Sequence, residues 1–206
     1  AIVDLPEPTA SRLYDIGQEG YQISIKTGNG EPSSSANYYM TGNLVDNVSG
    51  NSDRYGIDSK EYNNTIPEEA EKYYFQRIGD SYQFYIYKMD GLEKKYVQMT
   101  PVREKVARAG LTFAENESDK TAFSLINETE GRFQVSASIK TTSGAQKTYY
   151  WVRNTNGAGF GTIVGYENKS DVNTAWIGLH PERTSDPYDG KSYSLQTLRD
   201  KCHITR

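Results

Sequence analysis

The sequence of this 206-residue chain predicts an all-β domain, and three observations support that expectation. Short segments alternate apolar and polar residues with the period of two that is typical of a half-buried strand. Eighteen glycines, together with many Asn, Ser and Asp residues, supply frequent turns. One strand pattern also occurs three times along the chain. Seventeen tyrosines, six phenylalanines and two tryptophans provide the ring area for a core.

The first strand of the repeated pattern has an aromatic residue, then Gln, then alternating apolar positions. We expect this strand at residues 20–25, 81–86 and 132–137. A glycine-containing turn follows in each copy, because glycine readily adopts the positive φ of hairpin turns. A second strand with paired aromatic or similar residues comes next, at residues 37–40, 95–99 and 148–152.

Two further strands complete each copy of the pattern. The third strand leads into a polar turn and is expected at residues 54–57, 110–113 and 160–163. The fourth strand is expected at residues 74–78, 122–126 and 175–179. The first copy is the longest because it contains a polar stretch from Asp46 to Ala70. We interpret that stretch as an inserted loop with one helical turn at residues 67–70.

Three copies of four strands, each unable to bury its apolar face alone, predict a β-trefoil with pseudo-threefold symmetry. Such a fold closes six strands into a barrel and caps it with three hairpins, so that no sheet edge stays exposed. A β-sandwich is the alternative, because the spacing of the strands fits either architecture.

The trefoil domain is expected to span residues 12–182, after an N-terminal linker at residues 1–11. Residues 183–206 are interpreted as a linker and the start of a following repeat or domain, since Tyr188-Asp189-Gly190 is similar to Tyr14-Asp15-Ile16. No run of 18 apolar residues exists, which predicts no membrane insertion. We expect a monomeric module.

Charge and motifs argue against several classes of function. The net charge is −4 and no basic patch is concentrated in the sequence, so no nucleic-acid partner is expected. His180, Cys202 and His203 lack the spacing of metal ligands, which predicts no metal site and no cofactor. No nucleophile elbow or phosphate-binding loop is present. No motif singles out a pair among the 27 acidic residues, and we expect a protein that is not an enzyme.

The remaining signal is a surface suited to binding. Sugar rings stack on aromatic faces while polar neighbours bond to their hydroxyls, and aromatic residues on turns are candidates for both. The candidate ligand-binding residues are Tyr38, Tyr62, Trp151, Arg153, Asn154, Asn156 and Tyr166. Most aromatic residues of the repeated strands are instead expected in the core, namely Tyr21, Tyr82, Phe123, Phe133 and Trp176.

Several strings also suggest a family. The strings are Lys72-Tyr73-Tyr74-Phe75, Tyr82-Gln83-Phe84-Tyr85-Ile86, Lys95-Tyr96-Val97, and Thr174-Ala175-Trp176-Ile177-Gly178-Leu179. In pattern they resemble β-trefoil-like modules in large cell-surface proteins of Gram-positive gut Firmicutes, of the pilin and adhesin type. The resemblance implies an exported module associated with the cell surface or cell wall. The Gln-x-Trp signature of ricin-type lectins is missing, which argues against a sugar site of that type in each copy.

Taken together, these features predict an extracellular, non-catalytic binding module of a bacterial surface adhesin. Its partner would be a glycan or a host surface protein. A structural stalk or spacer domain is one alternative, and a trefoil protease inhibitor that acts through the loop from Asp46 to Ala70 is another. Five Asn-x-Ser/Thr sequons would carry glycans only if the source were eukaryotic, and they begin at Asn47, Asn63, Asn116, Asn127 and Asn168.

Overall fold

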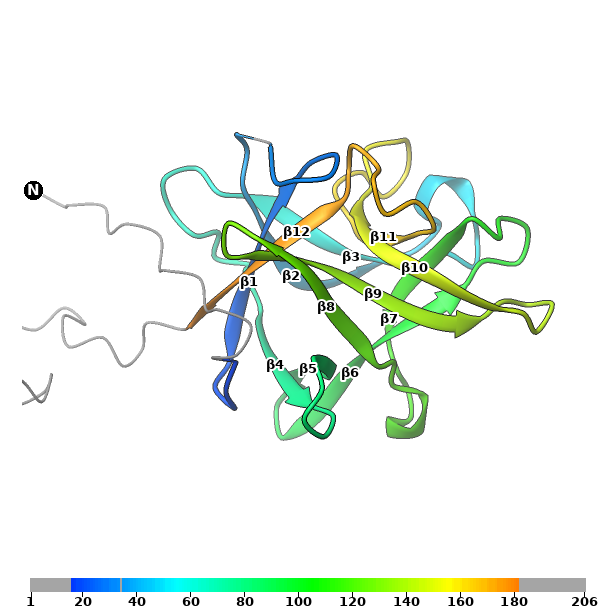
Figure 1. Ribbon diagram of the computed structural model, residues 1–206, viewed down its shortest axis with the longest axis horizontal. Helices are drawn as coiled ribbons and strands as arrows, with labels where there is room; N and C mark the ends of the chain where they lie inside the picture. Colours follow the sequence, from blue (N-terminus) through cyan, green and yellow to red (C-terminus); the bar gives the residue numbers. More distant parts are fainter. Residues whose placement is uncertain (1–15, 34, 182–206) are drawn as a thin grey trace, which may run out of the picture.

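A computed structural model describes residues 16–33 and 35–181, which form an all-β structure with twelve antiparallel strands in one sheet (Figure 1). The strands are β1 (Tyr21–Thr27), β2 (Tyr38–Val45), β3 (Gly56–Glu61), β4 (Lys72–Arg77), β5 (Gln83–Asp90), β6 (Glu93–Pro101), β7 (Arg108–Phe113), β8 (Phe123–Thr129), β9 (Arg132–Lys140), β10 (Gln146–Arg153), β11 (Ile163–Tyr166) and β12 (Ala175–Pro181). Two short 3-10 turns, Val48–Gly50 and Glu117–Asp119, are the helical elements of this part. Within it, no helix has the length and apolarity needed to cross a bilayer.

Six of the strands pair with one another in a closed ring. Strand β1 pairs with β4, β4 with β5, β5 with β8, β8 with β9, β9 with β12, and β12 again with β1. The other six strands form the hairpins β2–β3, β6–β7 and β10–β11. These hairpins meet where β11 pairs with both β3 and β7. The ring has no terminal strand, so each of its strands has a paired neighbour on both sides.

The expectation of an all-β domain is confirmed, and each of the twelve expected segments overlaps a strand. One prediction is displaced: the third strand of the last copy, expected at residues 160–163, begins at Ile163 because the three preceding residues form a turn. The helical turn expected at residues 67–70 is a simple turn, in which the amide of Ala70 donates to the carbonyl of Pro67 at 3.0 Å. The inserted stretch also contains all of β3.

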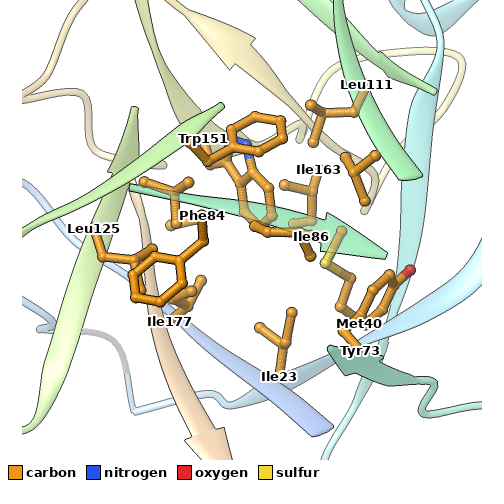
Figure 2. Packing of buried hydrophobic residues seen from close by; sticks show 14 of the residues in the cluster. Ile23, Met40, Tyr73, Phe84, Ile86, Leu111, Leu125, Trp151, Ile163 and Ile177 are labelled. Atoms are coloured by element: carbon orange, nitrogen blue, oxygen red, sulfur yellow. The ribbon is translucent and has the colours of Figure 1, made fainter. Parts of the chain in front are cut away.

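The core is built from side chains at alternate positions of the strands (Figure 2). Four of the five aromatic residues expected there, Tyr21, Phe123, Phe133 and Trp176, are buried. The fifth, Tyr82, is 49% exposed, and the expectation for it is wrong. It lies in the turn that precedes β5, where the guanidinium of Arg77 covers its ring at 5.4 Å from the centroid.

Two further expectations concern residues outside the described part of the chain. The linker at residues 1–11 is one of them. The segment at residues 183–206, with Cys202 and His203, is the other. Both stay predictions.

Tyr73 provides a test of how this core responds to alkaline pH. Its ring is fully buried and its hydroxyl donates to the carbonyl of Thr41 at 2.6 Å. Burial, and secondly the charge of Glu71, raise the pKa of Tyr73 well above its usual value. In the unfolded chain tyrosine ionises near about pH 10. The unfolded state therefore loses this proton first, and the stability that Tyr73 contributes is lost as pH rises above that value.

We expect the Tyr73→Phe variant to lose stability less steeply than the parent protein above about pH 10. Urea denaturation at a series of alkaline pH values measures the two slopes. Parallel slopes for parent and variant would contradict this account of Tyr73.

Candidate functional site

The surface of the described residues has several hollows, of which two are candidate binding sites. The first, the hairpin pocket, has a volume of about 140 Å³ and is lined mainly by polar residues around the β10–β11 hairpin. Four of the seven candidate residues from the sequence line it: Arg153, Asn154, Asn156 and Tyr166. Arg54 and Arg108, which sequence reasoning missed, line it too. Because these residues come from distant segments, their meeting depends on the tertiary structure.

Asn154 shapes the wall of the hairpin pocket. Its side chain is buried, and its amide nitrogen donates to the carbonyls of Asn156 at 3.0 Å, Gly159 at 3.1 Å and Ala158 at 3.3 Å. Its amide oxygen accepts a hydrogen bond from the hydroxyl of Ser49 at 3.1 Å. These contacts use most of the hydrogen-bonding capacity of the amide. Asn154 therefore holds the loop after β10 in place, whereas the sequence suggested direct contact with a ligand.

Arg153 turns away from the hairpin pocket and toward a neighbouring hairpin. Its guanidinium carbon lies 3.7 Å from the ring centroid of Tyr38, and its Nε donates to the hydroxyl of Ser59 at 3.2 Å. Burial lowers the pKa of Arg153, while Tyr38 and the nearby acidic residues act in the opposite direction. One face of Tyr38 is thus occupied by a cation. This contact brings two candidate residues together outside the pocket.

Two other candidate residues lie elsewhere. Trp151 is fully buried on β10 and packs edge-on against Phe123 with ring centroids 5.4 Å apart. The expectation that Trp151 lies on an exposed turn is wrong, because its position in the strand faces the core. Tyr62 is half-buried at the end of β3, with its ring centroid 6.0 Å from that of Tyr39. Neither Trp151 nor Tyr62 lines a hollow with the other candidates.

The second hollow, the tyrosine cleft, lies beside strands β4 and β5. These two strands are in the lower part of Figure 1. Tyr74 and Tyr87 line the cleft, and they continue into the buried Tyr96 on the next strand; these three residues are the tyrosine row. Tyr74 pairs with Tyr87 across β4 and β5, and Tyr87 pairs with Tyr96 across β5 and β6. The first two rings stack with centroids 5.1 Å apart and an interplanar angle of 11°. The third is tilted by 54° at 5.2 Å from the second.

The tyrosine row lies on the outer side of the sheet. Its neighbours along the strands, including Tyr73, Ile86 and Val97, are buried in the core, so the row occupies the opposite face. Tyr74 and Tyr87 are half-buried and line the tyrosine cleft. Each ring covers one face of the other, and the part of the pair that stays exposed borders the open volume of the cleft.

The tyrosine cleft has a volume of about 610 Å³. Polar and charged side chains lie beside its two rings, namely Gln18, Gln76, Arg77 and Lys94. The hydroxyl of Tyr96 donates to Oε1 of Gln76 at 3.1 Å, which holds that side chain beside the row. The ammonium of Lys94 lies 4.9 Å from the ring centroid of Tyr87. The cleft therefore combines apolar ring surface with hydrogen-bonding groups.

The tyrosine cleft was not predicted from the sequence, although the placement of tyrosines in two of its strands indicates it in part. In β4 and β5, tyrosines occupy the positions that alternate with the core residues, where polar residues are usual. Such an aromatic residue in the polar phase of a strand marks a ring that lies outside the core. The pairing of Tyr74 with Tyr87 depends on the register of two strands, which the sequence pattern does not specify.

The arrangement offers binding surface, and no metal centre is found in it. Among residues 16–33 and 35–181, no group of three His, Cys, Asp or Glu side chains is placed to hold a metal ion. Comparison with known proteins adds no further information: no family model, no curated protein and no solved structure matches the chain.

Proposed function

We propose that this chain is a non-catalytic glycan-binding module of β-trefoil type, exported and carried on the cell surface by a bacterial adhesin. The closed ring of six paired strands and the three hairpins that meet at β11 support a trefoil over a sandwich. The tyrosine cleft supports binding of a glycan. The adhesin context rests on the resemblance of the sequence strings alone.

The stacked pair of Tyr74 and Tyr87 is the observation that carries this proposal. The C–H groups of a pyranose ring pack on an aromatic face, while the sugar hydroxyls need hydrogen-bond partners beside it. Gln18, Gln76 and Lys94 supply such partners around the rings. A cleft of about 610 Å³ falls within the range of about 300–1,000 Å³ that is typical of small-molecule sites. The hairpin pocket, at about 140 Å³, is too small for a sugar ring by the same comparison.

Lys94 does not block the binding of a sugar. Its ammonium lies over Tyr87, but the side chain is exposed. A cation–π contact at an exposed site is worth roughly 0.5–1 kcal/mol. A sugar ring that displaces the ammonium therefore loses little, and the freed lysine bonds to a hydroxyl of the same sugar.

A glycan array probed with the full chain, followed by affinity measurements on the glycans retained, tests this function. We expect the Tyr87→Ala variant to bind those glycans about tenfold more weakly or worse, as is typical for truncation of a central aromatic contact. Tyr55→Ala is the matched control, because Tyr55 is also partly exposed but lines neither hollow. It should bind as the parent does. Circular dichroism confirms that both variants are folded.

Two outcomes would contradict the proposal. Equal affinity of Tyr87→Ala and the parent for the same glycans would remove the tyrosine cleft as the binding site. An array without any retained glycan would favour the other functions expected from the sequence, a structural spacer, a protease inhibitor or a module that binds a host protein.

A further inference from the structure

The hairpin pocket contains a fixed arginine that the proposed function does not use. Arg54 precedes β3 and is 4% exposed. Its Nε donates to the carbonyl of Ala109 at 3.2 Å, and its Nη2 donates to the carbonyl of Gly165 at 3.1 Å. Ala109 and Gly165 face each other where β7 pairs with β11. Arg54 therefore bridges two hairpins, and its guanidinium has little freedom to move.

A second arginine lies beside the first. Arg108 begins β7, pairs with Tyr166 on β11, and lines the same pocket. Burial, and secondly the positive charge of Arg108, lower the pKa of Arg54 to about 10. Arg54 therefore remains a cation at neutral pH. Two like charges thus lie close together in a partly buried place, an arrangement that costs free energy unless an anion is present.

The protein itself supplies little compensation for these two charges. The ion pairs formed within the described residues all involve lysines, and neither Arg54 nor Arg108 takes part in one. Within the same part of the chain, Nη1 of Arg54 has no hydrogen-bond partner, although the side chain lines the pocket. One hydrogen-bonding edge of a nearly buried guanidinium is therefore available to a ligand.

Two other charged residues line the pocket, Asp171 and Arg153, and both have hydrogen-bond partners other than Arg54 and Arg108. Oδ1 of Asp171 accepts a hydrogen bond from the amide of Asn173 at 2.9 Å, within a tight turn. The guanidinium of Arg153 lies over Tyr38 and donates to Ser59. With the guanidinium of Arg153 directed elsewhere, Arg54 and Arg108 face one aspartate across the pocket, in a chain whose net charge is −4. The charge of the pocket is therefore positive, whereas the net charge of the chain is negative.

We propose that the hairpin pocket binds a single oxyanionic group, a sulfate, phosphate or carboxylate, through Arg54 and Arg108. Guanidinium groups bind such anions through paired N–H donors, and preorganised arginines do so at lower entropic cost. A volume of about 140 Å³ accepts one such group and excludes a whole sugar ring. The site lies around the β10–β11 hairpin, apart from the tyrosine cleft, so its ligand is independent of glycan binding there.

The test is an NMR titration of the full chain with sodium sulfate at constant ionic strength, observing the side-chain Nε–Hε signals of arginine. We expect saturable shifts for Arg54 and Arg108. In the Arg108→Gln variant, sulfate should bind about tenfold more weakly or worse, because a hydrogen bond to a charged group is lost. Arg103→Gln removes the same charge from an exposed position outside the hairpin pocket and should bind sulfate as the parent does.

Two further titrations distinguish a free anion from an anionic group carried on a sugar. Glucose 6-sulfate and unmodified glucose are titrated under the same conditions. Binding of inorganic sulfate supports a site for the free group, and binding of glucose 6-sulfate alone supports a site for a sugar substituent. Glucose should cause no shift of the Arg54 signal.

The proposal is overturned if neither sulfate nor glucose 6-sulfate produces saturable shifts. Equal sulfate affinity of Arg108→Gln and the parent would overturn it as well, because Arg108 would then make no contribution to holding the anion. The Tyr87→Ala variant, which tests the glycan site, should retain sulfate binding. Failure of one site is therefore distinguishable from failure of the other.

Discussion

Replacing Trp151 with Ala is expected to lower the free energy of unfolding by about 3–5 kcal/mol, the cost typical of truncating a large buried aromatic residue. Trp151, labelled in Figure 2, is fully buried in the core. Its ring packs edge-on against that of Phe123, with centroids 5.4 Å apart. Because the closed ring of strands restricts collapse around the site, most of the vacated volume should remain as a cavity. Urea denaturation measures the loss, with an unchanged m-value as the sign that the unfolding transition is comparable.

Two further variants sharpen this result. Phe160→Ala removes an aromatic ring that is 62% exposed and should change stability by less than about 0.5 kcal/mol. Trp151→Phe retains most of the apolar ring area and removes the indole N–H, which is buried without a hydrogen-bond partner among the described residues. It should therefore cost clearly less than Trp151→Ala. A loss below about 1 kcal/mol for Trp151→Ala would contradict the placement of this side chain in the core.

Replacing Gly110 with Ala is the substitution with the next largest expected effect. A Cβ atom at this position would lie 2.8 Å from the amide nitrogen and 2.9 Å from the carbonyl oxygen of Tyr55. Both are backbone atoms, so no side-chain rotation relieves the contact. The same carbonyl accepts a hydrogen bond from the amide of Leu111 at 2.8 Å, which ties β7 to the segment before β3. We expect a loss of about 1–3 kcal/mol, as is typical for overpacking of a well-packed site.

Thermal or urea denaturation of Gly110→Ala checks this expectation. Thr112→Ala, a truncation on the same strand at a half-buried position, is the control and should cost less. If Gly110→Ala unfolded at the same urea concentration as the parent protein, the close approach of Tyr55 to β7 would be wrong. If the added Cβ atom displaces the backbone of Tyr55, it also displaces Arg54, the preceding residue. We therefore expect Gly110→Ala to weaken sulfate binding at the hairpin pocket as well.

The candidate sites show where sequence reasoning stops. Arg153, Asn154 and Asn156 are close in sequence, and Tyr166 joins them through a single hairpin, so a local argument gathers these four. Arg54 and Arg108 come from other hairpins and reach the same pocket only because β11 pairs with β7. The misplacement of Trp151 has a related cause. Its exposure depends on which face of β10 meets the core, and an aromatic-rich strand carries little contrast between its two faces.

The sequence by itself determined the all-β class and the approximate place of every strand, because alternation and turn residues are local properties of the chain. The tertiary structure alone decided the register that stacks Tyr74 on Tyr87 and the meeting of the hairpins that brings Arg54 to Arg108. The physical reason is that each strand accepts several partners and registers of similar local energy. Only the simultaneous burial of all their apolar faces selects one arrangement, and that arrangement places the rings and charges on the surface.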